Sequence, residues 1–213
     1  MQERATVPRG RHAPPLEVRQ SRQRGRLFAA AAAVFARAGY ADATAEAIAR
    51  EAGMSKATFY EHFANKEECI VALFDAATDT VLHAMRQAAA RETAEDPQAR
   101  VRTTLGAFLE TLASYPDESQ TLLVEIVGAG PRALERRDRA LEAVTQYLDE
   151  LNAQDAARGV TPRLSEHDTF AIVGAVVELA SRQIRTGVPG DIRELEPVVE
   201  RLTLGLLAAA ARP

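Results

Sequence analysis

Residues 44–66 gather side chains that could hydrogen-bond to an extended anionic partner. The segment holds the only two lysines of the chain, Lys56 and Lys66, with Tyr60 and His62 between them. An ammonium, a phenol and an imidazole can all donate hydrogen bonds to oxygen. The phosphates and base edges of nucleic acid present acceptors for such donors. The segment therefore indicates a binding surface for nucleic acid, and it contains no recognisable set of catalytic residues.

The spacing of the same segment predicts a helix, a tight turn and a second helix. Thr44 and Ser55 are suited to cap the two helices at their N-termini, and Gly53 lies where the turn favours a positive φ angle. Phe59 and Phe63 are four residues apart, so they share one face of the second helix and should face the core between the pair. The opposite face of the second helix is then left for a partner.

That outward face fits the major groove of DNA, which is about 12 Å wide and admits a helix. The N-terminal turn of such a helix enters deepest, so Lys56, Ala57 and Thr58 are expected at base edges and the remaining candidates at phosphates. The alternatives are solvated charges for the lysines and an ordinary exposed aromatic for Tyr60. The candidate DNA-binding residues are Thr44, Ser55, Lys56, Ala57, Thr58, Tyr60, His62, Lys66, Arg22, Arg24 and Arg26.

The distribution of charge agrees with a polyanion at one end of the chain. Residues 1–66 carry 11 Lys and Arg against 6 Asp and Glu, whereas residues 67–213 carry 15 against 24. A basic N-terminal third joined to an acidic body favours contact with nucleic acid at the basic end. Chance clustering is the alternative that charge alone leaves open.

Helical periodicity and capping residues predict an all-α fold of about nine helices. Residues 1–18, with three prolines and three arginines, are expected to form a flexible basic arm, residues 19–66 a three-helix DNA-binding domain, and residues 67–213 a larger helical domain. The expected helices cover about 21–37, 44–52, 55–63, 65–91, 97–114, 122–127, 131–158, 165–186 and 195–211.

Composition argues against several other classes of protein. The sequence contains no run of 18 apolar residues, so no membrane span is predicted. The N-terminus lacks the apolar core of a secretory signal. A single cysteine, Cys69, is typical of a reducing cytoplasm. The histidines, at positions 12, 62, 83 and 167, lack the spacing of metal ligands, and no glycine-rich phosphate loop occurs. We therefore expect no cofactor, no metal and no enzymatic activity.

Residues 24–70, with TAEAIAREAGMSKATFYEHFANKEECI at their centre, resemble the DNA-binding domain of the TetR family of bacterial transcriptional regulators. The small-residue turn, the Tyr-x-x-Phe pair and the Asn-Lys-Glu-Glu that opens the next helix carry the resemblance. Two departures are Cys69 and Phe59, where the family more often has Leu. The resemblance implies a ligand-responsive regulator, most often a repressor, that binds a palindromic operator as a homodimer.

The resemblance also implies that residues 67–213 dimerise and bind a small-molecule effector. Between Phe170 and Ala180 the only residue that is neither apolar nor Gly is Glu178, so we expect homodimerisation through the last two helices, with a buried helix pair in a monomer as the alternative. Phe74, Phe108 and Tyr147 are the candidate ligand-binding residues, although plain core packing explains each equally well.

Two other functions compete with a DNA-binding regulator. One is an all-α small-molecule carrier or adaptor protein without specific DNA binding, in which the basic end is incidental. The other is an all-α enzyme, which would need a catalytic set that the sequence does not display. Specific binding to a duplex that weakens steeply with salt separates the regulator from both.

Overall fold

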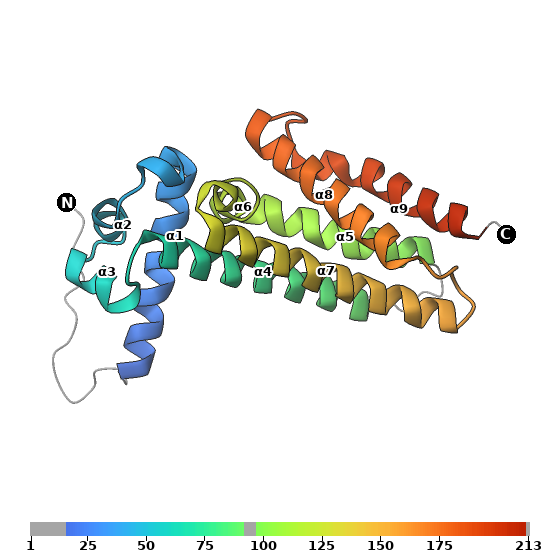
Figure 1. The fold of residues 1–213 in the computed structure, drawn as a ribbon, viewed down its shortest axis with the longest axis horizontal. Coiled ribbons are helices and arrows are strands. Elements are labelled where there is room, and N and C mark those ends of the chain that lie inside the picture. The colour runs from blue at the N-terminus through green and yellow to red at the C-terminus, as the bar shows by residue number, and fades with distance from the viewer. Residues whose placement is uncertain (1–15, 92–96, 212–213) are drawn as a thin grey trace.

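Three helices form the N-terminal end of the molecule in the structure, a computed structural model that describes residues 16–91 and 97–211. They are α1 (Leu16–Asp42), α2 (Ala45–Glu51) and α3 (Lys56–His62). Figure 1 shows them packed together at one end, with the other helices extending away from them. Nine α-helices and two short 3-10 helices account for the regular structure of the described ranges, where no strand occurs. The all-α prediction is confirmed.

Local hydrogen bonds explain where α2 and α3 begin. The Thr44 hydroxyl accepts a hydrogen bond from the Ala47 amide at 3.1 Å, and the Ser55 hydroxyl accepts one from the Thr58 amide at 3.0 Å. Each satisfies an amide that the helix itself leaves without an acceptor. Gly53 between the helices has φ +64°, a value that favours glycine. The predicted helix, turn and helix are therefore confirmed.

Helix α1 is longer than the periodicity predicted. It begins at Leu16, so residues 16–18 of the expected arm are helical, and the rest of that arm lies outside the described residues. At Gly39 the backbone adopts φ 74° and ψ 159°, which interrupts the helix, and a last short turn follows to Asp42. Gly39 was expected to end the helix; instead it kinks it and sets Tyr40 and Ala41 at a new angle.

Aromatic and aliphatic side chains fill the centre of the N-terminal domain. Phe59 is 0% exposed and Phe63 1% exposed, and their ring centroids lie 5.5 Å apart. Ile48 of α2 and Phe35 of α1 are fully buried in the same hydrophobic cluster. The predicted inward orientation of the two phenylalanines is confirmed, and it fixes which face of α3 is left outside.

Helix α4 (Lys66–Arg91) connects the N-terminal domain to the rest of the molecule. Its 26 residues span about 39 Å, and its buried side chains include Cys69 near the start and Met85 near the end. The helix contacts α1 as well as α5, α6 and α7. One continuous helix therefore contributes to the cores at both ends.

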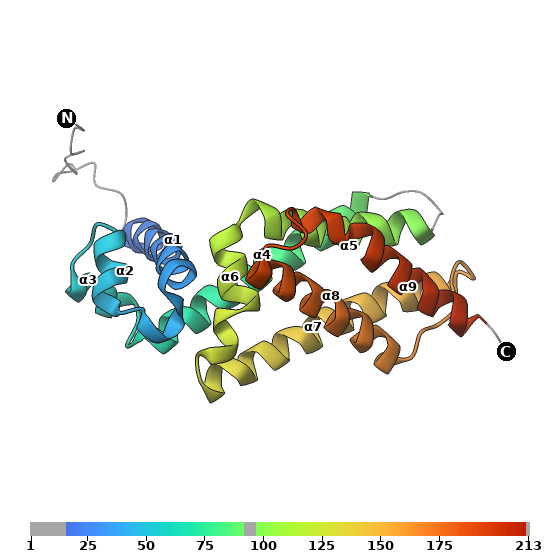
Figure 2. The same cartoon turned by 90° about the horizontal axis from the view of Figure 1, so that it is seen from above.

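The C-terminal part is a bundle of helices that includes the far part of α4 along one side (Figures 1 and 2). It consists of α5 (Pro97–Ser114), α6 (Pro116–Leu123), η1 (Glu125–Gly128), α7 (Pro131–Ala157), α8 (Glu166–Thr186), η2 (Ile192–Leu195) and α9 (Glu196–Ala210). In Figure 1, α8 and α9 lie on the side of the bundle away from α4. No helix in the described ranges is long and apolar enough to cross a bilayer.

One helix of the bundle ends earlier than expected. The sequence predicted a single short helix through Val127, but α6 ends at Leu123 and the tighter η1 follows. Val124 has φ −120° and ψ −60°, outside the usual helical range, so the chain turns there. This turn directs the Glu125 side chain back towards α1.

The thiol of Cys69 should be unreactive in the folded chain. The side chain is fully buried, and burial raises the pKa of the thiol from 9.0 to about 12. The thiol therefore stays protonated in the folded state at pH values where the unfolded chain releases the proton. We expect no reaction with a thiol reagent at pH 8 until denaturant is added.

The same pKa shift predicts a pH dependence of stability. The free energy of unfolding should decline as pH rises from about 9 towards 12, because the unfolded state binds fewer protons there. Cys69→Ala is the control, since it retains the other titrating groups. Parallel stability curves for the two proteins across that interval would contradict the assigned shift.

Candidate nucleic-acid interface and effector cavity

The outer face of α3 presents the residues that the sequence selected for base contact. Lys56 and Ala57 are exposed, Tyr60 is 47% exposed, and Thr58 is half-buried. Phe59 faces the core, so its neighbours are turned outward at the N-terminal turn of the helix. The small side chain of Ala57 leaves that turn open to close approach by a flat or grooved partner.

Lys56 is held by a carboxylate of the preceding helix. Its ammonium forms an ion pair with Glu46 of α2 and lies 5.8 Å from the centroid of the Tyr60 ring. The hydrogen bond between the two side chains raises the pKa of Lys56 and lowers that of Glu46. Both side chains are about half exposed, so water screens the pair. An incoming acceptor would compete with Glu46 for the Lys56 protons.

Hydroxyl groups surround the start of α3. The Ser55 and Thr58 hydroxyls lie 3.0 Å apart, and Ser55 already accepts from the Thr58 amide. When the Ser55 proton is donated to Thr58, the Thr58 proton remains available to an external acceptor. Thr44 is exposed at the start of α2, and its hydroxyl oxygen caps that helix. Ser55 is thus first of all a capping residue.

His62 and Lys66 differ from the outward orientation that the sequence indicated. The Nε2 atom of His62 is buried without a hydrogen-bond partner, so that nitrogen is not available to a phosphate in this arrangement. The Lys66 ammonium donates to the carbonyl oxygens of Tyr40 at 2.5 Å and Ala41 at 3.1 Å, and lies 4.3 Å from the centroid of the Tyr40 ring. The kink at Gly39 exposes these carbonyls, and Lys66 satisfies them.

The three candidate arginines of α1 have different surroundings. Arg22 is exposed, whereas the Arg24 guanidinium lies 5.0 Å from the ring centroid of Phe28 and 4.8 Å from that of Phe63. Arg26 donates to the carbonyl oxygen of Ala52 at 2.5 Å, and so ties α1 to the turn between α2 and α3. Arg24 and Arg26 therefore stabilise the domain as well as carrying charge.

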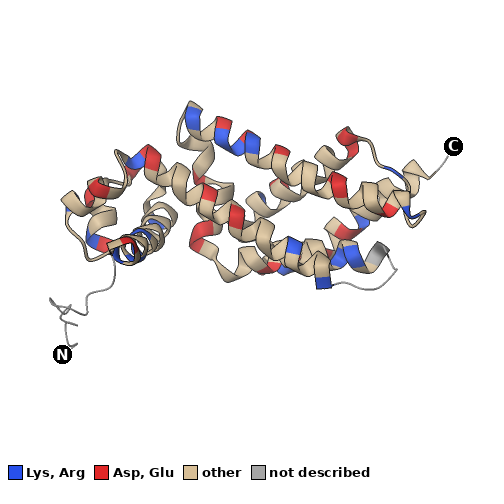
Figure 3. Ribbon diagram, turned by 90° about the horizontal axis from the view of Figure 1, so that it is seen from below, with Lys and Arg blue, Asp and Glu red and all other residues tan. Residues whose placement is uncertain are grey.

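Basic residues are not confined to the N-terminal domain. Figure 3 shows Lys and Arg on α1 and also at the beginning of α7, although Asp and Glu outnumber them in residues 67–213. Part of the α7 charge is paired locally, since Arg136 contacts Asp75 at 2.6 Å and Arg139 contacts Glu135 at 2.6 Å. The net charge of a segment therefore describes its surface only in part.

Glu125 joins the two ends of the molecule, a role that sequence analysis missed. One carboxylate oxygen accepts from the Tyr40 amide at 2.7 Å, and the other accepts from the Gln120 side chain at 2.9 Å. The Tyr40 amide needs this acceptor because the kink at Gly39 takes it out of the regular helix. The two residues are 85 positions apart, so no local pattern could reveal the contact.

Two of the three predicted ligand-binding residues meet at one cavity, which we call the proximal cavity. It has a volume of about 50 Å³ and lies between α4, α5, α6, α7 and α8. Phe74 and Phe108 line it together with Leu122, Leu123 and Val177. The walls are mainly apolar, so the cavity suits an apolar ligand or part of one.

Tyr147, the third candidate, does not line the proximal cavity. Its hydroxyl is buried without a hydrogen-bond partner, and the Arg86 guanidinium lies 5.4 Å from its ring centroid. Burial raises the pKa of the phenol, and Arg86 opposes that shift. Periodicity placed Tyr147 beside the apolar face of α7 but did not show which neighbours it contacts.

Comparison with known proteins relates this sequence to bacterial regulators. The family described as "Bacterial regulatory proteins, tetR family" matches residues 27–73, which span most of α1, α2, α3 and the start of α4. The HTH-type transcriptional activator FasR of Mycolicibacterium smegmatis is 29% identical over 134 residues, which make up 63% of this chain and 60% of FasR. The alignment thus spans less than two thirds of the length of FasR.

Solved structures share the fold over most of its length. The fatty acid degradation regulator FadR of Bacillus halodurans superposes with a TM-score of 0.78 at 22% identity, covering 86% of this chain and 95% of that one. FadR of Bacillus subtilis, solved in complex with stearoyl-CoA, gives a TM-score of 0.75 at 18% identity, covering 85% and 98%.

The matched segment is the one that places α3 outward on a core of phenylalanines, and the rest of the bundle has the architecture of these regulators. Residues 27–73 therefore carry a segment of the tetR family of bacterial regulatory proteins, within a fold that this chain shares with solved regulators.

Proposed function

We propose that this protein regulates transcription by binding a specific DNA sequence through α3, and that a small effector bound in the C-terminal bundle controls this binding. The observation that carries the proposal is the exposed N-terminal turn of α3, held from behind by Phe59 and Phe63 within the segment that matches the family. The proposed site of action is the bacterial cytoplasm, where a regulator meets DNA.

The structure supports a division of roles among the candidate residues. Lys56, Ala57 and Thr58 would face base edges, with Lys56 donating to guanine acceptors after leaving Glu46. Tyr60 and Thr44 would contact phosphates at the rim. Lys66, Arg24 and Arg26 would act mainly by holding the domain in shape, since each already interacts with a carbonyl or a ring.

A homodimer formed through α8 and α9 would present two copies of α3. The surfaces of these helices include exposed apolar side chains, with Phe170 49% exposed and Val198 39% exposed, and an exposed glycine, Gly205. Burying such residues against a second copy is favourable, and small residues allow close approach. Two half-sites about 34–36 Å apart would then be read together, which requires a palindromic operator.

The effector would act through contacts that lead from the bundle to α1. Leu122 and Leu123 of α6 line the proximal cavity, and Glu125 follows them by two residues. A ligand that moves α6 would therefore disturb the hydrogen bond between Glu125 and Tyr40. For control, the ligand must bind one of two arrangements of the protein more tightly than the other. The preferred arrangement is either the one that binds DNA poorly or the one that binds it well. Repression, the direction expected from the sequence, stays a prediction, and a reporter gene measures it.

Selection of bound oligonucleotides from a random duplex pool tests the proposal. We expect the purified chain to enrich a short inverted repeat and to bind it with an affinity that falls steeply as salt increases. A carrier or adaptor protein without specific DNA binding would enrich no sequence over the starting pool.

Lys56→Ala and Thr58→Ala should each weaken binding to the selected duplex by roughly tenfold or more and relax the preference at one or two base pairs. The reason is that each removes a donor to a base edge. Quantitative binding to single-base variants of the duplex measures both effects. Glu46→Gln is the matched control, because it releases Lys56 without removing it. Wild-type discrimination by both alanine variants would refute the assigned base contacts.

Tyr60→Phe should weaken binding to all duplexes alike, by roughly three- to tenfold, because only a hydroxyl directed at a phosphate is lost. The dependence of affinity on salt should be unchanged, since no charge is removed. Titrations with the selected duplex and with a scrambled one measure this. A loss confined to the selected duplex would instead place Tyr60 at a base edge.

Glu125→Ala should free the Tyr40 amide, because it removes the acceptor that Tyr40 uses in place of a helical carbonyl. We expect hydrogen exchange at Tyr40 to accelerate and the free energy of unfolding to fall by about 1–3 kcal/mol. Glu125→Gln keeps an acceptor oxygen, so its exchange rate at Tyr40 and its free energy of unfolding should lie between those of the wild type and of Glu125→Ala. Glu142→Ala, at an exposed position of α7, should match the wild type in both. Unchanged exchange at Tyr40 would remove Glu125 from the proposed route.

A further inference from the structure

A second cavity lies farther from the N-terminal domain, between α5, α7, α8 and α9, and we call it the distal cavity. Its volume is about 80 Å³, and aliphatic side chains such as Leu105, Leu148 and Ile172 form much of its wall. Cavities of this kind, mostly apolar with a few polar groups, are typical of small-molecule sites. The polar groups therefore decide what kind of molecule could enter.

Two polar atoms on the α5 wall of the distal cavity have no partner. Thr104 is 3% exposed, and its hydroxyl is buried without a hydrogen bond; the Nε atom of Arg100 is in the same condition. The residues are four apart on α5, so their Cβ atoms are neighbours, about 5–6 Å apart. An unsatisfied buried donor is costly, and such groups in a native structure call for an explanation.

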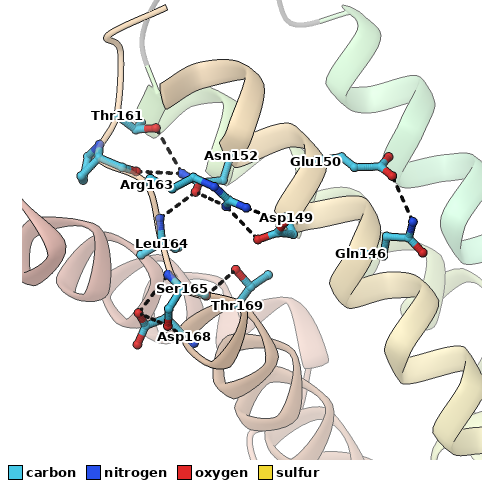
Figure 4. A network of polar contacts seen from close by, with 11 residues as sticks. Gln146, Asp149, Glu150, Asn152, Thr161, Arg163, Leu164, Ser165, Asp168 and Thr169 are labelled. Carbon is cyan, nitrogen blue, oxygen red and sulfur yellow. Dashed lines mark hydrogen bonds and ion pairs between the residues drawn. The ribbon is translucent and has the colours of Figure 1, made fainter. Parts of the chain in front are cut away.

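The other polar residues around the distal cavity are satisfied. The Thr203 hydroxyl donates to the carbonyl oxygen of Val199 at 3.0 Å. Figure 4 shows the connection between α7 and α8, where Asn152 donates to the carbonyl oxygen of Pro162 at 3.0 Å and accepts from the Leu164 amide at 2.9 Å. The lack of partners is therefore specific to the α5 wall.

The charge beside Thr104 favours an anionic or oxygen-rich group. Asp155 is buried and pairs with two guanidinium groups, those of Arg100 at 2.5 Å and of Arg158. Two cations and one carboxylate leave an excess of one positive charge. Together with the Thr104 hydroxyl and the Arg100 Nε–H, they form a place where a carboxylate or carbonyl oxygen could accept two hydrogen bonds.

The distal and proximal cavities are aligned along the same three helices. On α5, Leu105 lines the distal cavity and Phe108 lines the proximal cavity. The corresponding pairs, with the distal residue first, are Leu148 and Val144 on α7, and Ile172 and Val177 on α8. The steps are three, four and five residues, roughly one turn each, so the two cavities follow one another along the bundle. A ligand that occupied both cavities would require the side chains between them to move apart.

We propose that the distal cavity binds the oxygen-bearing head of an aliphatic acyl compound, with the Thr104 hydroxyl and the Arg100 Nε–H as donors and the chain directed towards the proximal cavity. This inference rests on the proposed function in one respect, namely that the bound compound would be the effector. Binding itself involves no chemical change in the ligand.

Binding is tested with the full chain and three probes of equal chain length, by calorimetry and thermal shift below their micelle concentrations. Decanoate carries a free carboxylate, decanoyl-coenzyme A carries a thioester carbonyl, and decylamine carries a cation. We expect one or both acyl compounds to bind with one molecule per chain, and their comparison identifies the source of the acyl group. Equal or tighter binding of decylamine, or no binding of either acyl compound, would overturn the inference.

Thr104→Val tests the site directly, because valine has the same shape without the hydroxyl. We expect the ligand-free variant to melt at a higher temperature, since an unpaired buried hydroxyl is removed, and to bind the acyl probe about three- to tenfold more weakly. Thr203→Val is the matched control, since Thr203 lines the same cavity but its hydroxyl is already bonded. Equal effects of the two variants on affinity would show that Thr104 has no special role.

The two proposals can fail separately. Selection of an operator uses no ligand, so a chain that enriches an inverted repeat but ignores both acyl probes overturns the acyl inference alone. A chain that binds an acyl probe through Thr104 but enriches no duplex keeps the binding site and overturns the proposed regulator.

Discussion

The continuity of α4 is the constraint on which the rest of the structure depends. Its first turns are buried against the N-terminal domain through Cys69 and Ile70, and its later turns against the bundle through Val81 and Met85. A helix propagates a displacement along its whole length because each turn is bonded to the next. The α3 end of the molecule and the cavities therefore share one continuous helix.

A second link runs beside α4 and makes the junction more specific. The kink at Gly39 leaves the last turn of α1 with unsatisfied backbone groups, and these are taken up by Lys66 from α4 and Glu125 from η1. The same few residues thus receive one contact from each side of the junction. A ligand that displaced either partner would leave backbone groups of this turn without a hydrogen bond.

Local chemistry was readable from the sequence, and distant contacts were not. The caps at Thr44 and Ser55, the turn at Gly53 and the inward phenylalanines depend on residues within a few positions of one another, so their patterns predicted them. The orientations of Lys66 and His62, the contact of Glu125 with Tyr40, and the position of Tyr147 depend on tertiary neighbours. Hydrophobic periodicity gives the face of a helix but not the atoms opposite it.

Disulfide trapping tests most directly whether the outer face of α3 meets DNA. Because Cys69 is buried with a raised pKa, Ala57→Cys would supply the one reactive thiol. We expect this variant to crosslink to a selected duplex bearing a thiol tether on a base within a half-site, and we expect no crosslink from Gln154→Cys, at an exposed position near the end of α7. Crosslinking through position 154 with none through position 57 would contradict this expectation.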